Sequence, residues 1–152
     1  MNLECACIEP TFLLYVTILQ HETRARREIS WSKNMVNIVY IHSHDTGRYV
    51  QPYGYSIPTP AIQRLAEQGA LFRKAFCANP TCSPSRASLL TGQWAHSCGM
   101  GGLVNRGWSL PNPDRLLPNF LRQHGYSTVR AGIQHVVKDP EEGGYSRILG
   151  GE

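Results

Sequence analysis

The sequence has few cysteines and few charged residues, and both shortages exclude classes of protein. The five cysteines are an odd number at low density, so they do not make the framework of a disulfide-rich domain. No two of them have the Cys-x-x-Cys spacing of a zinc site. Charged residues make up 17% of the chain, too small a share for a disordered protein whose charges repel. We therefore expect a folded, mostly reduced chain with at least one cysteine kept for chemistry.

A long apolar run and a clear targeting signal are also lacking. Residues 12–19 are apolar but too few to cross a bilayer. Glu4 and Glu9 precede them, where a signal peptide would carry positive charge. The basic cluster at residues 24–27 is not part of a stripe interleaved with aromatic side chains, and is typical of a solvated arm. We expect no membrane span and no nucleic-acid partner. The localisation is unknown, and the chain as it stands is predicted to be cytoplasmic.

Residues 1–34 differ from the rest of the chain. They contain no glycine and only one proline, and they show no alternation of strand, turn and helix patterns. From Met35 onward the pattern becomes regular, and Met35 is a candidate for the natural start of the folded part. We predict an N-terminal extension over residues 1–34, a candidate for disorder, followed by a folded domain over residues 35–152.

Strand and helix patterns alternate after Met35. Strands are expected over residues 36–41, 70–76 and 127–131. Helices are expected after Thr59 up to Gly69, over 87–91 up to Gly92, and over 118–124 up to Gly125. A long loop is expected over 99–115, and the closing Gly150-Gly151-Glu152 offers no strand or helix to close a sheet. This order favours an α/β fold with a largely parallel sheet flanked by helices. Ligand sites in such sheets lie beyond the carboxyl ends of the strands.

Cys82 opens the stretch Cys82-Ser83-Pro84-Ser85-Arg86, which is typical of a loop that enters a helix. Pro84 suits the first turn of a helix, where its missing N–H would have no partner. The free N–H groups of that turn and the Arg86 guanidinium would make a positive pocket for an anion. A cysteine in such a place is a plausible nucleophile. The alternative is a buried cysteine packed beside a capping loop.

The longer string from Pro80 to Gly92, Pro-Thr-Cys-Ser-Pro-Ser-Arg-Ala-Ser-Leu-Leu-Thr-Gly, resembles the signature of the sulfatase family at nearly every constrained position. The resemblance extends over about Met35 to the end of the chain and is closest to bacterial sulfatases of the heparan N-sulfatase type. It implies the fold of the alkaline phosphatase superfamily, of which this chain would hold an incomplete, N-terminal part.

The resemblance implies that Cys82 is oxidised after translation to formylglycine by a formylglycine-generating enzyme, which reads Pro84 and Arg86. One hydroxyl of the hydrated aldehyde would attack sulfur and displace an alcohol or amine. The other would then expel sulfate as the aldehyde re-forms. Arg86 would stabilise the hydrated aldehyde and its developing negative charge. The implied substrate is a sulfated small molecule or saccharide, cleaved at a sulfuric ester or a sulfamate.

The resemblance also implies a divalent metal, expected to be Ca²⁺, beside Cys82. Two adjacent aspartates bind it in the family, and Asp45 matches the second of them. His44 stands at the first position, a departure because calcium prefers oxygen ligands. We predict Asp45 as a metal ligand, with His44 and Cys82 as further candidates. For His42 and His44 the alternative is an ordinary polar loop.

The stretch from Gly125 to His135 resembles the second signature of the family. His135 matches a histidine there, and would act as the acid that protonates the leaving group. Ile133 stands where the family has a lysine that binds sulfate, so the missing charge must come from elsewhere or turnover is weak. The alternative for His135 is a structural role at a strand end.

Two other functions stay open on the sequence. The family's second pair of metal ligands has no candidate after His135, which favours a catalytically inactive fragment of a sulfatase-like protein. A phosphonate or phosphate monoester hydrolase on the same scaffold is the third possibility, because Cys82 alone does not separate these enzymes.

Overall fold

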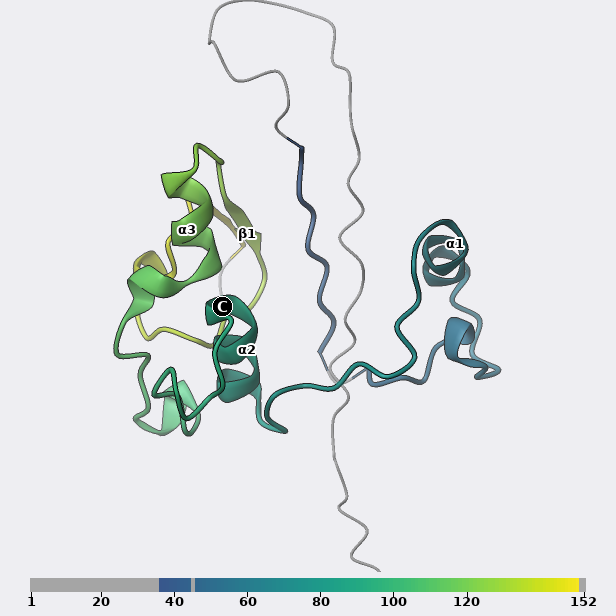
Figure 1. Ribbon diagram of the computed structural model, residues 1–152, viewed down its shortest axis with the longest axis horizontal. Helices are drawn as coiled ribbons and strands as arrows, with labels where there is room; N and C mark the ends of the chain where they lie inside the picture. The colour runs from purple at the N-terminus through teal and green to yellow at the C-terminus, as the bar shows by residue number, and fades with distance from the viewer. Residues whose placement is uncertain (1–35, 45, 151–152) are drawn as a thin grey trace, which may run out of the picture. The chain divides into compact units, whose positions relative to one another are not determined.

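The computed structural model describes residues 36–44 and 46–150, which fall into two compact units. The first unit ends at Phe76, and the described part of the second unit begins at Cys77 (Figure 1). The predicted extension over residues 1–34 and the predicted metal ligand Asp45 lie outside the described residues.

The first unit contains a short 3₁₀ helix, η1 (Gln51–Tyr53), and the helix α1 (Pro60–Gln68). Helix α1 confirms the helix expected between Thr59 and Gly69, with Pro60 at its first position. Thr59 is the N-cap residue, but its hydroxyl accepts a hydrogen bond from the Gln51 N–H at 3.0 Å and does not cap the helix. The Gln51 side chain in turn accepts from the Thr59 N–H at 3.2 Å, so this pair joins η1 to the start of α1.

The strands expected over residues 36–41 and 70–76 are absent from the described structure. Residues 36–41 contain a single bridge position at Asn37, and the segment 70–76 includes a turn at Arg73–Lys74. Large apolar side chains in both segments are exposed, with Phe76 at 87%. An apolar, β-branched run gives a strand only when its backbone pairs with a neighbouring strand and its side chains are covered. Among the described residues of this unit, pairing is limited to the bridge position at Asn37 and the large apolar side chains of both segments are exposed, so neither segment is a strand.

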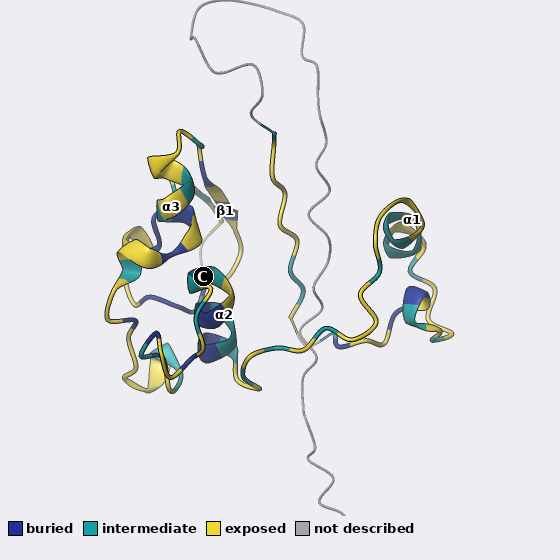
Figure 2. Ribbon diagram, viewed as in Figure 1, coloured by how far each residue is buried: buried dark blue, intermediate teal, exposed yellow. Residues whose placement is uncertain are grey.

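The second unit is built around helix α2 (Cys82–Thr91), which is longer than the helix expected at residues 87–91. Its buried face contacts a core formed by residues that are far apart in the sequence (Figure 2). The core contains Ala87, Cys98, Met100, Leu110, Leu116, Val136 and Val137. The loop expected at 99–115 contributes two of these side chains, Met100 and Leu110, and includes two 3₁₀ turns, η2 (Val104–Arg106) and η3 (Pro113–Arg115). The loop therefore packs on α2 and helps to fix its position.

A two-stranded parallel sheet completes the second unit. Strand β1 (Val129–Ala131) pairs with strand β2 (Arg147–Leu149), and Val129 lies opposite Arg147. Helix α3 (Leu117–Gln123) precedes β1, and the 3₁₀ helix η4 (Pro140–Gly143) lies between the strands. Strand β1 and helix α3 confirm the expected elements there. Strand β2 was not expected, because three residues are too few to show the alternation of apolar and polar side chains that predicts a strand. In the structure, two exposed side chains flank one half-buried residue. Parallel pairing with helices nearby agrees with the predicted α/β class.

Among the described residues, no helix is long and apolar enough to cross a membrane.

The C-terminal end of α2 offers a test of the local structure. Gly92 follows the helix with a φ of +66°, and nothing lies within 4 Å of the position that a Cβ would occupy. Replacing Gly92 with Ala is therefore expected to lower the free energy of unfolding by about 1–2 kcal/mol through backbone strain alone. Thermal or urea unfolding would measure it. The control is Gly92→Asn, which tolerates this conformation and should cost less; an equal loss for both variants would contradict this explanation.

Candidate active site

Cys82 is the first residue of helix α2 and is half-buried. The first intrahelical hydrogen bond runs from the Ser85 N–H to the Thr81 carbonyl at 3.0 Å. The N–H groups of Cys82 and Ser83 have no intrahelical acceptor in this position, and Pro84 has no N–H at all. The Asn79 side chain accepts from the Thr81 N–H at 2.9 Å and so fixes the chain as it enters the helix. The thiol thus lies at the positive end of a helix, as the sequence predicted.

Arg86 lies beside the Cys82 sulfur. The two residues are four positions apart on α2, so their side chains share one face. The Arg86 Nε–H donates to the Cys82 Sγ at 3.2 Å, and Nη1 donates to the Ile133 carbonyl at 3.0 Å. The guanidinium is therefore held between the helix and the loop after β1. It brings a permanent positive charge to the sulfur.

His135, which is far from Cys82 in the sequence, contacts the same sulfur. Its Nδ1 lies 3.4 Å from the Cys82 Sγ, and either atom can be the donor, depending on the tautomer. His135 has a φ of +52° and is the one non-glycine residue in the described ranges with a positive φ. A left-handed backbone at a non-glycine residue costs free energy and is often found where a side chain is aimed at a site. Cys82, Arg86 and His135, the three predicted catalytic residues, thus meet at one point.

Sequence reasoning missed Gln134, whose side chain organises the loop around His135. Its amide is buried, and its oxygen accepts from the N–H groups of Val136 at 2.6 Å and Val137 at 2.9 Å. Its nitrogen donates to the Val137 carbonyl at 2.5 Å. The one signal in the sequence was a polar residue directly before His135 in an otherwise apolar stretch.

Tyr145 and Arg130 lie near this site and were also missed. The Arg130 guanidinium carbon lies 6.0 Å from the centre of the Tyr145 ring, within the range of a cation–π contact. Burial raises the pKa of the Tyr145 phenol above its usual value of 10.0, and the charges of Arg130 and Arg86 oppose that rise. The phenol is therefore neutral at ordinary pH and available as a hydrogen-bond donor. Nothing in the sequence around Tyr145 marked it as part of a site.

The predicted metal ligands belong to different parts of the chain, and Asp45 lies outside the described residues. No three His, Cys, Asp or Glu residues gather as a possible metal site within residues 36–44 and 46–150. His44 belongs to the first unit and Cys82 to the second. The His44 carbonyl accepts from the Thr46 hydroxyl at 3.4 Å, and the His42 ring stacks on Tyr40 with 6.0 Å between ring centres. The role of His44 as a metal ligand stays a prediction.

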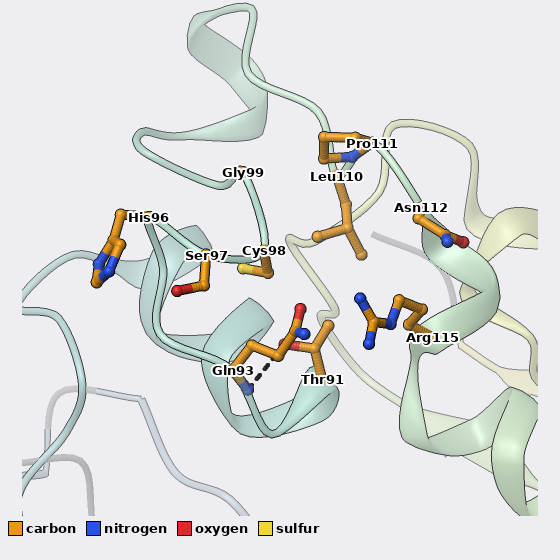
Figure 3. Close-up of a pocket in the computed structure, with 10 residues that line it drawn as sticks. All are labelled: Thr91, Gln93, His96, Ser97, Cys98, Gly99, Leu110, Pro111, Asn112 and Arg115. Carbon is orange, nitrogen blue, oxygen red and sulfur yellow. Dashed lines mark hydrogen bonds between the residues drawn. The ribbon is translucent and has the colours of Figure 1, made fainter.

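A separate cavity of about 200 Å³ lies at the opposite end of α2 from Cys82 (Figure 3). Since α2 rises about 1.5 Å per residue, this end lies about 14 Å along the axis from Cys82. Its lining includes none of the predicted catalytic residues. The lining residues are Thr91, Gln93, His96, Ser97, Cys98, Gly99, Leu110, Pro111, Asn112 and Arg115.

Cys82 therefore has the surroundings expected of a nucleophilic side chain: its thiol lies at a helix N-terminus, with a guanidinium and an imidazole in contact with its sulfur. Comparison with known proteins gives the family. The family model described as Sulfatase matches residues 36–152. The chain belongs to the sulfatase family.

Individual relatives agree with this assignment. The chain is 36% identical over 107 residues to N-acetylgalactosamine-6-sulfatase of Sus scrofa, covering 64% of this chain and 20% of the relative. It is 30% identical over 118 residues to N-acetylglucosamine-6-O-sulfatase of Bacteroides thetaiotaomicron, covering 76% and 21%. It is 33% identical over 110 residues to arylsulfatase of Klebsiella aerogenes, covering 66% and 24%.

The chain thus spans about a fifth to a quarter of the length of these relatives. No solved structure matches the chain. The coarser assignment to the sulfatases is confirmed, while the finer likeness to heparan N-sulfatase stays a prediction.

Proposed function

We propose that this chain carries the nucleophile end of an enzyme that hydrolyses sulfuric esters or sulfamates, with Cys82 converted to formylglycine. The observation that carries the proposal is the contact of both Arg86 Nε and His135 Nδ1 with the Cys82 sulfur. The thiol marks the position from which a formylglycine hydroxyl would attack sulfur. Sulfated sugars are the proposed substrate class, because two of the matched relatives are named as sulfatases of N-acetylated amino sugars.

Arg86 and the first turn of α2 would bind the sulfate group. The guanidinium is held by the Ile133 carbonyl at 3.0 Å, so it is already oriented before a substrate binds. A charge that is fixed in advance stabilises a developing anion without reorganising during the reaction. The Ile133 side chain cannot supply a charge, although the family has a lysine there. The Ile133 backbone instead holds Arg86 in place, and this supports the reading that Arg86 is the main cation at this point.

His135 would transfer a proton at the same point. Its Nδ1 faces the sulfur, and a leaving group expelled from an in-line attack needs a proton as its bond to sulfur breaks. The ring is half-buried, so it is open to a substrate on one side. If His135 were purely structural, replacing it would lower the rate by the same factor for every leaving group.

A divalent metal, with Ca²⁺ as the expected ion, stays part of the proposal through Asp45. Asp45 would supply carboxylate oxygen, the ligand type that calcium prefers, and His44 and Cys82 are the other candidates. Such an ion would supply charge neutralisation at the sulfate. The described side chains do not form its shell, so we assign no step to it.

The conversion of Cys82 is the direct test. The chain is produced with a formylglycine-generating enzyme, digested and analysed by mass spectrometry. The peptide that contains Cys82 is expected to lose about 18 daltons, the difference between a thiol and an aldehyde side chain. Cys77 and Cys98 are internal controls, because neither is followed by the Pro-x-Arg pattern. If Cys82 keeps its mass while a control peptide is converted, the proposal fails.

The choice of substrate separates the remaining functions. Converted protein is assayed on an aryl sulfate and on the matching aryl phosphonate. Faster turnover of the sulfate supports the proposal, and faster turnover of the phosphonate would replace it with the phosphonate hydrolase alternative. No turnover of either by converted protein would favour the inactive-fragment alternative for these 152 residues.

A further inference from the structure

We infer that Gln134 is a positioning residue for His135: its buried amide clamps the loop after β1 so that the imidazole faces Cys82. The inference deepens the proposed function and rests on it for the role of His135. The geometry on which it depends is that of the unconverted thiol.

The clamp engages both ends of the amide. The Gln134 oxygen accepts from two successive N–H groups, those of Val136 and Val137, and the nitrogen donates to the Val137 carbonyl. Donors face the oxygen and an acceptor faces the nitrogen, so this orientation of the amide satisfies every partner. A side chain that bonds to the backbone two and three positions ahead holds the intervening residue in a tight turn. That intervening residue is His135.

The clamp is anchored in the core of the second unit. Val136 and Val137 are 1% and 2% exposed and belong to the cluster that also contains Ala87 of helix α2. Gln134 therefore connects the loop to the helix that carries Cys82. On the other side of His135, the Ile133 carbonyl is held by Arg86. The backbone is thus held by hydrogen bonds on both sides of His135, and these bonds maintain its left-handed conformation.

An apolar side chain of similar size would break the clamp. Gln134→Leu leaves the N–H groups of Val136 and Val137 and the Val137 carbonyl without their present partner in a buried place. The turn would relax toward an ordinary backbone, and the imidazole would leave the sulfur. Gln134→Glu keeps the oxygen that accepts from the two N–H groups and places a second acceptor against the Val137 carbonyl, so it removes one of the three hydrogen bonds and is the more conservative variant.

The test measures how fast iodoacetamide alkylates Cys82 at neutral pH in protein made without the formylglycine-generating enzyme. In this reaction the sulfur–carbon bond forms, iodide leaves and the thiol proton passes to a base, for which the His135 ring is placed. The rate is read from the mass of the Cys82 peptide, relative to Cys77 in the same chain. His135→Ala and Gln134→Leu are each expected to slow it by about three- to tenfold, the range expected for one lost hydrogen-bonded arrangement.

The double variant is the decisive measurement. If Gln134 acts through His135, adding Gln134→Leu to His135→Ala slows alkylation no further. The matched control is Thr128→Val, which breaks another buried network, with the Gly144 carbonyl at 3.2 Å and the Ser146 N–H at 3.1 Å, and should leave the rate unchanged. A Gln134→Leu protein that reacts at the wild-type rate or faster, or that slows the His135→Ala protein further, overturns the inference.

Gln134→Glu covers the case in which Gln134→Leu does not fold. Its alkylation rate is expected to lie between those of the wild type and His135→Ala, and a wild-type rate would sink the idea. Because alkylation uses the thiol, a failure of formylglycine conversion leaves this test intact. A failure of the clamp would in turn leave the conversion test intact.

Discussion

Replacing Arg86 with Ala is expected to lower kcat on an aryl sulfate by about 10²–10³-fold, the loss typical when one preorganised donor to a developing anion is removed. The guanidinium donates both to the Cys82 sulfur and to the Ile133 carbonyl, so its removal takes a donor from both acceptors at once. Turnover is counted per converted molecule, because Arg86 is also predicted to be part of the pattern that the converting enzyme reads. Mass spectrometry gives the converted fraction.

The matched control for this prediction is Arg122→Ala. Arg122 is an exposed arginine in the last turn of α3, so its removal changes the net charge equally but leaves the site intact. Its kcat should stay near the wild-type value. Arg86→Lys is expected to recover only part of the activity, since an ammonium lacks the planar fork that contacts two acceptors at once. A converted Arg86→Ala protein within threefold of the wild type would remove Arg86 from the mechanism.

Replacing His135 with Ala should have an effect that depends on the leaving group. A sugar alcohol is a poor leaving group and needs a proton, so kcat on a sugar sulfate is expected to fall by about 10²-fold. A nitrophenol leaves readily as an anion, and the loss on its sulfate should be at most about tenfold. Steady-state kinetics on the two substrates gives both numbers.

His124→Ala is the control for the His135 variant. His124 is exposed at the end of α3, where its ring bonds to the Phe120 carbonyl at 2.8 Å, whereas the described contacts of the Cys82 sulfur are with Arg86 and His135. Its removal should leave both substrates unaffected. Equal losses on both substrates for His135→Ala would instead indicate a structural role.

The site was more predictable from the sequence than the fold around it. Cys82 and Arg86 were predicted together because Pro84 marks the entry into a helix, where free N–H groups and the guanidinium would surround the thiol. The structure begins the helix at Cys82 itself, so the two residues lie four positions apart on one face. His135 was found only through the resemblance to a family signature. Its contact with Cys82 spans 53 positions, and no local pattern reports such a distance.

The failures have a common physical cause. Residues 36–41 have the apolar, β-branched side chains that are common in strands. A strand also needs a neighbouring strand for its backbone hydrogen bonds, and hydrophobicity alone does not supply one. Strand β2 was missed for the opposite reason, since three residues that read Arg-Ile-Leu become a strand only because β1 lies beside them. Gln134 was missed because the sequence does not distinguish a glutamine that hydrogen-bonds to the nearby backbone from one that is exposed to solvent.

The placement of His135 between two paired strands has a consequence for how the centre assembles. Strands β1 and β2 run in the same direction, so the chain between residues 131 and 147 must travel back across the unit before the second strand can pair. The His135 imidazole belongs to that returning segment. The Cys82 sulfur belongs to helix α2, which comes earlier in the sequence and is held by local hydrogen bonds. The contact between the imidazole and the sulfur therefore depends on the return segment being in place, whereas the helix end that carries the cysteine depends on local contacts alone.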